Sequence, residues 1–286
     1  MIFFSHVPRT GGTTVHHYFS KPFGGPEQVR SGNFEPGSRW LVVSDAYELP
    51  AVAEVVRNLP DRDYYLGGHI GLHHLAEAGI SLEPSDMVIA MVRNPVERAI
   101  SLFYLAQRSP DWLPFLRPEV TARGFTYFYT HCRNSGVFFH NDHCRTLAGS
   151  ESFEDARDRL ETHFDLVGSQ SAMGAFEFAL ARVCKPRISG FAIVPARENA
   201  AFHYSTVGGK WRPKERVEEL AGAELIARIE SDNREDVRLV DFVERLHKGL
   251  FWNERKRGEV YCSDRSRAGR LWETLDPTCD VSYSAD

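Results

Sequence analysis

The chain has 286 residues, a formal net charge of −5 and five cysteines, and 42% of its residues are hydrophobic. A chain of this length and composition can bury one large α/β core or two small ones. The mild negative charge excludes a general basic surface for nucleic acid or an acidic membrane. No apolar run approaches the length of a membrane span. The widely spaced cysteines favour reduced thiols over a disulfide framework.

The chain opens with a predicted strand, loop and helix. The apolar run from Ile2 to Val7 predicts a buried strand that Pro8 ends, and the apolar spacing from Val15 to Phe19 predicts a helix. The glycines between them let the backbone approach an anion closely, and the first N–H groups of a helix are unsatisfied and point at such an anion. The sequence therefore predicts an anion-binding loop made of Arg9, Thr10, Gly11, Gly12, Thr13 and Thr14.

This loop differs from the Walker A motif of nucleotide-binding proteins. That motif requires Gly, four residues, and then Gly-Lys-Ser or Gly-Lys-Thr, whereas no lysine follows Gly12. A site for ATP or GTP with magnesium therefore loses its main support. Because glycine and threonine also occur in ordinary turns before helices, the prediction needs a second anion site to support it.

The next segments continue an α/β pattern. Residues 21–38 are rich in glycine, proline and polar side chains and predict a loop. Strands are predicted at Trp40–Ser44 and Tyr64–Leu66, and helices at Leu49–Leu59 and Ile70–Ala78. The second of these strands runs into Gly67-Gly68-His69, which places an imidazole at a strand end.

The strongest predicted strand is the fully apolar run from Met87 to Val92, as expected of a central parallel strand. Arg93 follows it directly. Asn94 fits the N-cap of a helix, with Pro95 at the first helical position and Glu97 at the capping-box spacing.

A second anion site is predicted around this helix start. Arg98 and Ser101 fall on one helix face, and Arg93 stands at the carboxyl end of the strand, the edge at which open parallel sheets bind ligands. Guanidinium groups and a hydroxyl there suit a phosphate. An ion-paired arginine and an ordinary helical serine would give the same sequence, so that alternative stays open.

Together the two segments resemble the PAPS-dependent sulfotransferases, particularly the Golgi carbohydrate type exemplified by heparan sulfate 2-O-sulfotransferase, and its bacterial relatives. In that family one strand is followed by Pro-Lys-Thr, two small residues, Thr and Ser. A later strand is followed by Arg, Asp or Asn, and Pro, with Arg and Ser on the next helix. The matching stretches here are residues 8–14 and 93–103. Residues 65–72, 141–149 and 164–168 resemble further family segments, so the similarity covers roughly residues 2–247.

The resemblance implies an α/β fold with a P-loop-like strand–loop–helix core and a central parallel sheet flanked by helices. It implies a sulfotransferase domain at residues 1–250 and leaves residues 251–286 as an unplaced polar C-terminal extension. Residues 9–14 would bind the 5′-phosphosulfate of PAPS, and Arg93 and Ser101 its 3′-phosphate. His69 would be the general base. Arg9, where the family usually has lysine, would be catalytic at the bridging oxygen, and Gly67 replaces a second histidine of some relatives.

Other chemically capable residues lie outside these motifs. Several are metal-ligand types, but their spacing fits no paired zinc motif, so no metal site is predicted; they are His131, Cys132, His140, Asp142, His143 and Cys144. His73 and His74 are expected at the surface or in support of His69. Lys210 and Arg212 could close over the nucleotide, as a late basic loop does in relatives.

The sequence thus predicts an enzyme that moves a sulfuryl group from PAPS to a hydroxyl acceptor, with carbohydrate as the acceptor class on family analogy. Two alternatives stay open: a P-loop-type nucleotide kinase, and a sulfotransferase-like nucleotide-binding module without turnover. Because the predicted loop begins close to Met1, no signal peptide or anchor is expected. This indicates a cytoplasmic protein with no nucleic-acid or membrane partner.

Overall fold

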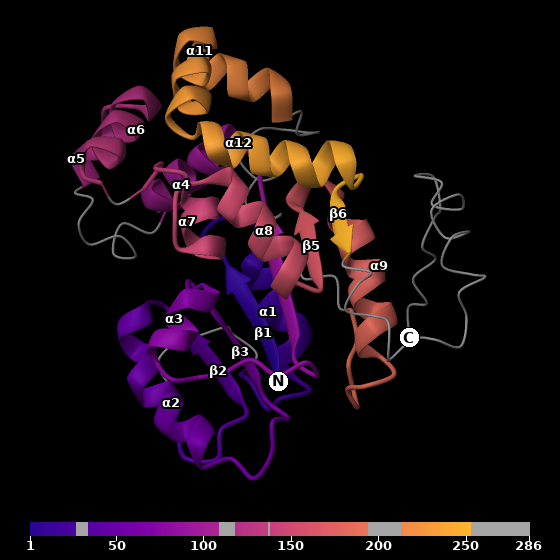
Figure 1. Cartoon of the computed structure of the whole chain (residues 1–286). Helices are drawn as coiled ribbons and strands as arrows, with labels where there is room; N and C mark the ends of the chain where they lie inside the picture. Colours follow the sequence, from indigo (N-terminus) through magenta and orange to yellow (C-terminus); the bar gives the residue numbers. More distant parts are fainter. Residues whose placement is uncertain (27–33, 109–117, 137, 194–212, 253–286) are drawn as a thin grey trace, which may run out of the picture. The chain divides into compact units, whose positions relative to one another are not determined.

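The computed structural model describes residues 1–26, 34–108, 118–136, 138–193 and 213–252. They form an α/β fold around a mostly parallel central sheet flanked by helices (Figure 1), which confirms the predicted α/β class and its central sheet. Within this described part, six strands pair in the order β2-β3-β1-β4-β5-β6, and only β6 is antiparallel to its neighbour. The strands are β1 (Ile2–His6), β2 (Trp40–Val43), β3 (Tyr65–Gly68), β4 (Met87–Val92), β5 (Leu166–Ser169) and β6 (Leu250–Trp252).

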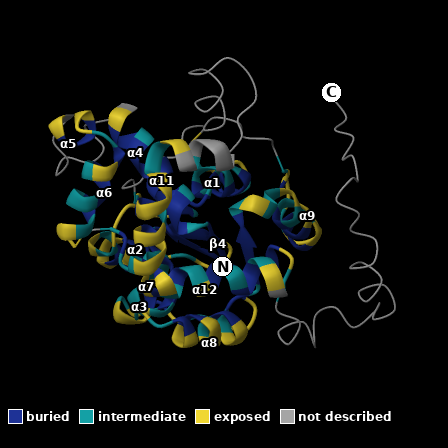
Figure 2. Ribbon diagram, turned by 90° about the horizontal axis from the view of Figure 1, so that it is seen from above, coloured by how far each residue is buried: buried dark blue, intermediate teal, exposed yellow. Residues whose placement is uncertain are grey.

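The two central strands, β1 and β4, are buried along their whole length. Phe3 and Val88 are paired in register and belong to the core on one face of the sheet, whereas Phe4 and Ile89 belong to the core on the other. Figure 2 shows the strands in the buried colour and exposed positions gathered on helices such as α8. A parallel strand covered on both faces in this way is apolar at every position, which is why its sequence does not alternate.

Helices cover each face of the sheet. One face carries α2 (Leu49–Arg57), α3 (Leu72–Glu77), α7 (Asp142–Ala148), α8 (Phe153–His163) and α12 (Arg234–Asp241); the other carries α1 (Gly12–Ser20) and α9 (Met173–Cys184). A separate apolar cluster joins α4 (Pro95–Arg108), α5 (Pro118–Ala122), α6 (Phe125–Asn134) and α11 (Pro213–Asp232). Short helical turns lie at η1 (Ala46–Glu48), η3 (Gln170–Ala172) and η4 (Phe242–Leu246). In the described part of the chain, no helix combines the length and apolar character needed to cross a bilayer.

The strand order defines where loops can form a site. The chain passes from β1 outward to β2, returns to β3, and then crosses β1 to reach β4. The carboxyl ends of β1 and β4 therefore lie at the point where the order reverses, which is where open α/β sheets have their crevice. The two predicted anion-binding segments follow these two strands.

Most element predictions agree with the structure. Asn94 accepts hydrogen bonds from the N–H groups of Val96 and Glu97 (2.9 and 3.2 Å), which confirms it as the cap of α4. The helix predicted from Ile70 begins instead at Leu72, because Gly71 is extended. The compact unit runs from Met1 to Trp252 and so passes the predicted boundary at residue 250, since β6 is part of the sheet. Residues 253–286 lie outside the described residues.

Candidate functional site

The loop between β1 and α1 makes a sharp turn. Arg9 has a φ of 71° and Gly11 a φ of 96°, both in the left-handed region. Such a backbone costs of order 1–3 kcal/mol at a residue other than glycine, so the surrounding contacts must hold Arg9 in place. One of them comes from the Thr10 hydroxyl, which donates to the Val7 carbonyl at 2.8 Å. Thr10 is fully buried and stabilises the turn through its side chain.

The first turn of α1 follows this loop directly. The helix begins at Gly12, and the N–H of Thr14 donates to the Gly11 carbonyl at 3.1 Å. The first N–H groups of a helix have no partner within it and favour an anion at its N-terminus. Thr13 and Thr14 are only partly buried. In the predicted anion-binding loop, Thr13 and Thr14 are thus the partly accessible threonines, while Thr10 is buried and supports the turn.

The side chains of the two predicted anion sites meet. The guanidinium of Arg9 donates to the hydroxyl of Ser101 from Nε at 3.1 Å and from its second terminal nitrogen at 2.9 Å. Arg93 donates from its guanidinium to the Arg9 carbonyl at 3.2 Å. Arg9 is separated from Ser101 by 92 positions in the sequence and from Arg93 by 84. These contacts therefore join two distant segments at one edge of the sheet.

The two arginines of the second motif have different surroundings. Arg93 is buried, and its Nε lies 3.4 Å from a Glu97 carboxylate oxygen. Burial lowers the pKa of Arg93, and Glu97 acts in the opposite direction. Arg98 is fully buried in an ion pair with Asp142 and lies over the ring of Phe139. Of the two, Arg98 stabilises the packing of α4 on the start of α7 and on Phe139 before it, and Arg93 is the one that contacts the loop.

A buried His–Asp pair lies behind Arg93. The Nδ1 of His143 is 2.7 Å from a carboxylate oxygen of Asp236, and both side chains are wholly inaccessible to solvent. The other ring nitrogen of His143 accepts from the backbone N–H of Arg93 at 3.2 Å. Asp236 also accepts from the backbone N–H groups of His143 and Cys144. The pair fixes the backbone of Arg93 to α7 and α12.

These contacts also account for part of the group of metal-ligand residue types noted in the sequence. Asp142 pairs with Arg98, and His143 pairs with Asp236. Across the described ranges, no group of three or more histidine, cysteine, aspartate or glutamate side chains is arranged to hold a metal ion. The segment 141–149 instead supports both arginines of the second motif.

His69 lies just beyond the carboxyl end of β3 and is half-buried. Its Nδ1 is 3.1 Å from the Ser44 carbonyl. A carbonyl can only accept, so Nδ1 carries the proton and Nε2 keeps its lone pair. Burial lowers the pKa of His69, while the contact with Ser44 and the carboxylates of Asp45 and Glu48 raise it. The ring is thus a neutral imidazole with a fixed tautomer.

Two histidines that the sequence did not single out complete this edge. Nδ1 of His6, at the end of β1, lies 3.2 Å from Nε2 of His16 on α1. Nδ1 of His16 lies 2.7 Å from the Tyr65 hydroxyl. The ring centroid of His6 is 4.8 Å from that of His69. The signal for His6 was its position in the sequence, because it lies at the end of a predicted strand just before the loop, much as His69 directly follows β3.

Glycines make room for these rings. A Cβ on Gly12 would lie 2.0 Å from Nε2 of His6, and a Cβ on Gly67 would lie 2.7 Å from the Tyr65 hydroxyl and 2.9 Å from the ring of His16. The space beside Gly67 is therefore occupied by Tyr65 and His16. Gly12 serves packing against His6 as well as any approach to an anion.

Replacing Gly12 with alanine is expected to destabilise the fold by about 1–3 kcal/mol, the usual cost of overpacking. The reason is the clash between the new methyl group and the His6 ring. Gly174→Ala, in the first turn of α9 with no atom near its Cβ position, is the matched control and is expected to be neutral or mildly stabilising. Urea unfolding of both variants measures the difference, and equal stability would contradict the contact between Gly12 and His6.

The other predicted residues lie apart from this cluster or outside the described residues. His74 accepts from the Gly71 N–H at 3.0 Å and so caps α3, and the ring of His73 lies 3.8 Å from that of His74. Lys210 and Arg212 lie outside the described residues.

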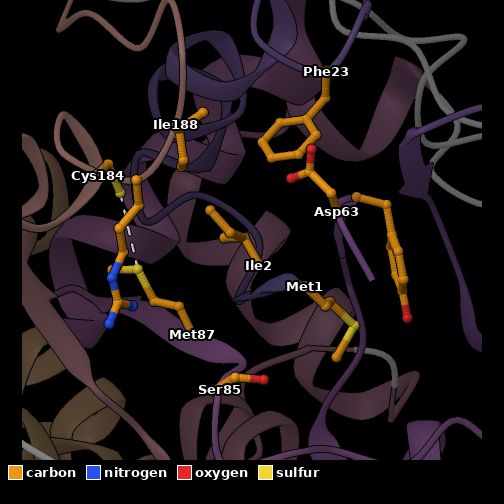
Figure 3. A pocket seen from close by; sticks show the side chains of 10 residues that line it. Met1, Ile2, Phe23, Asp63, Ser85, Met87, Cys184 and Ile188 are labelled. Carbon is orange, nitrogen blue, oxygen red and sulfur yellow. Dashed lines mark hydrogen bonds between the residues drawn. The ribbon is translucent and has the colours of Figure 1, made fainter. Parts of the chain in front are cut away.

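A small pocket of about 130 Å³ lies at the opposite edge of the sheet. Figure 3 shows Met1, Ile2 and Met87 among its lining side chains, from the amino-terminal ends of β1 and β4. No predicted site residue lines it. The pocket therefore lies at the amino-terminal edge of the sheet, whereas the two motifs lie at its carboxyl edge.

No protein-family model matches the chain, and no curated protein sequence matches it. The function proposed next therefore depends on the residues and contacts described above.

Proposed function

We propose that the protein is a PAPS-dependent sulfotransferase that moves a sulfuryl group to a hydroxyl acceptor, with a carbohydrate as the acceptor class. The observation that carries this proposal is the contact of Arg9 with Ser101 and of Arg93 with the Arg9 carbonyl. It joins a loop suited to one anion to a helix start suited to another, as a nucleotide with phosphates at both its 5′ and 3′ positions requires. This proposal includes a P-loop-like strand–loop–helix core, in which the loop between β1 and α1 binds an anion as a P-loop does.

Each group of residues has a proposed role. The loop from Arg9 to Thr14 holds the 5′-phosphosulfate through the N–H groups of α1 and the hydroxyls of Thr13 and Thr14. Arg93 and Ser101 bind the 3′-phosphate. Because Arg9 contacts Ser101, its guanidinium lies between the two sites and can balance charge that develops on the bridging oxygen as it leaves.

The proposed reaction uses His69 as its base. The acceptor oxygen forms a bond to sulfur while the bond from sulfur to the bridging phosphate oxygen breaks, which releases PAP. The acceptor proton passes to Nε2 of His69, the ring nitrogen that is not bonded to Ser44. Positioned N–H groups and arginines carry the developing charge, so this reaction requires no metal ion.

A binding experiment and a transfer assay test the proposal. Isothermal titration calorimetry without magnesium is expected to show binding of PAP and much weaker binding of ATP and GTP. A radiolabelled PAPS assay over glycans, small hydroxyl compounds and peptides is then expected to show transfer to a hydroxyl. Tight, magnesium-dependent binding of ATP would favour a nucleotide kinase, and PAP binding without transfer to any acceptor would favour a binding module without turnover.

Arg93→Ala is expected to weaken PAP binding by about 1.5–3 kcal/mol, or roughly 10–150-fold, because a charged hydrogen-bonding contact is lost. Ser101→Ala removes one hydroxyl and is expected to cost less, about 0.5–1.5 kcal/mol. Calorimetry with PAP measures both. Arg145→Ala, an exposed arginine on α7 near Glu151, is the control and should leave PAP affinity unchanged. Equal affinity of the parent protein for PAP and for adenosine 5′-monophosphate would rule out recognition of the 3′-phosphate.

A further inference from the structure

The ring of His6 lies between the anion-binding loop at Gly12 and the proposed base His69. On one side its Nε2 occupies the space that a Gly12 side chain would fill, at the first residue of α1. On the other side its ring centroid is 4.8 Å from that of His69. Phe4 stacks on the same ring with centroids 5.4 Å apart. The buried ring of His6 therefore fills the space between the anion-binding loop and the proposed base and keeps them apart.

A hydrogen-bonded chain of Tyr65, His16 and His6, called the histidine chain below, holds this ring in place. Both links are short enough for hydrogen bonds, at 2.7 Å from Tyr65 to His16 and 3.2 Å from His16 to His6. Tyr65 is fully buried, and burial raises the pKa of its phenol well above the ordinary value, so the hydroxyl keeps its proton. Within the described residues, His16 Nδ1 is the acceptor found for that proton.

The direction of the chain follows from counting protons. If Tyr65 donates to Nδ1 of His16, the neutral His16 ring carries its proton on Nε2 and donates to Nδ1 of His6. His6 then carries its own proton on Nε2, the atom that faces Gly12. The reverse direction would leave the buried phenol proton of Tyr65 without an acceptor among the described residues. Burial lowers the pKa of both His6 and His16, which keeps all the rings neutral near pH 7.

We propose that His6 is a positioning residue, which sets the distance between the anion-binding loop at Gly12 and the base His69 and is held in one orientation by His16 and Tyr65. This inference rests on the proposed sulfotransferase function. Transfer in line with the leaving oxygen requires the donor sulfur and the base at a fixed separation. A displacement of about 1 Å can lower such a rate by about 10²-fold even when the reacting groups are intact.

Two variants test the chain at its ends. His6→Asn keeps an acceptor for His16 but removes the part of the ring that contacts Gly12 and His69. It is expected to lower kcat by about 10²-fold, with PAP affinity changed by less than about threefold. Tyr65→Phe removes only one oxygen atom and so preserves packing. It is expected to release the fixed tautomers of His16 and His6, seen in long-range ¹H–¹⁵N NMR spectra of the free protein.

The pH profile provides a readout that a general loss of stability would not move. His69 is faced by Ser44, Asp45 and Glu48 beyond β2, by His6 on β1 with Arg9 beyond it, and by His16 on α1. Since burial is the main cause that lowers the pKa of His69, a smaller residue at position 6 admits water and returns that pKa toward its ordinary value. The NMR titration of His69, and the acid limb of kcat, should both move to higher pH in His6→Asn. His163→Asn, at the exposed end of α8, is the control and should change neither.

The outcomes separate this inference from the proposed function. The NMR measurements need no donor or acceptor, so a shifted His69 titration and released tautomers would support the histidine chain even if no transfer were found. A folded His6→Asn protein with an unchanged His69 titration and unchanged kcat would overturn the positioning role while leaving PAPS-dependent transfer intact. Unchanged ¹⁵N shifts of His6 and His16 in Tyr65→Phe would overturn the chain itself.

Discussion

Replacing His69 with alanine is expected to lower the rate of sulfuryl transfer by about 10²–10⁴-fold, the usual contribution of a positioned general base. PAP affinity should remain nearly unchanged, because the nucleotide contacts are proposed for the loop after β1 and for Arg93 and Ser101. Steady-state kinetics with saturating PAPS and calorimetry with PAP separate the two quantities. A large loss of PAP affinity would instead assign His69 to donor binding.

The pH dependence gives this prediction a sign. Because burial lowers the pKa of His69, its neutral form persists to lower pH than that of an ordinary imidazole. The rate should therefore be level near neutral pH and fall only below about pH 6.5, the ordinary histidine value. In His69→Ala that acid limb should disappear. If full activity and the limb both survive the substitution, the base lies elsewhere, and His73 and His74 become the next candidates.

Tautomer geometry suits His69 to the proposed role of general base. The Ser44 carbonyl holds the proton on Nδ1, so the lone pair on Nε2 is presented in one direction. Asp45 and Glu48 raise the pKa and so favour the imidazolium that forms when the acceptor proton arrives. Burial and these carboxylates therefore act in opposite directions on the same ring. Burial is the larger effect, so the ring is neutral before the proposed transfer, and the two carboxylates offset part of the cost of the imidazolium that forms.

The sequence predicted the strands of the sheet, and the loop and helix starts of both proposed anion-binding segments, because their signals are local. Residues that are neighbours in the chain mark the change from strand to loop to helix around Gly11 and Gly12, and they mark the N-cap at Asn94 in the same way. The sequence predicts the contact of Arg9 with Ser101 only in part. The motifs place both residues at the carboxyl edge of the sheet, but they do not give the geometry of the side chains. The contact itself is a property of the strand order, in which β1 and β4 are adjacent.

Other parts of the site could not be predicted from local patterns. His16 has the spacing of an ordinary buried helix residue, and nothing nearby in the sequence shows that Tyr65, 49 positions away, bonds to it. Arg98 looked equivalent to Arg93 on sequence, yet its ion pair with Asp142 depends on how α7 packs against α4. His143 resembled a metal-ligand type, but its partner Asp236 lies 93 positions away. Long-range polar pairs of this kind leave no periodic signal.

Replacing Asp236 with alanine is expected to destabilise the fold by about 3–5 kcal/mol, the cost of removing one partner from a buried pair. Asp236 accepts from Nδ1 of His143 and from the backbone N–H groups of His143 and Cys144, and all of these donors are buried. Asp241→Ala on the same helix removes an exposed carboxylate paired with Arg245, so it should cost less than about 1 kcal/mol. Urea unfolding of the two variants measures the contrast.

The same substitution should change stability against acid and the binding of PAP. Burial raises the pKa of Asp236, but the contacts with His143 and the charge of Arg98 together outweigh burial and hold that pKa below the ordinary value. A lowered pKa stabilises the fold above the unfolded aspartate value of about 3.9, and this contribution is lost as the pH falls below it. The Asp236→Ala variant lacks that contribution. The difference in free energy of unfolding between the parent protein and the variant should therefore become smaller below about pH 4. Because His143 holds the backbone of Arg93, PAP affinity should also fall in the folded variant, and unchanged affinity would show that Arg93 keeps its position without this pair.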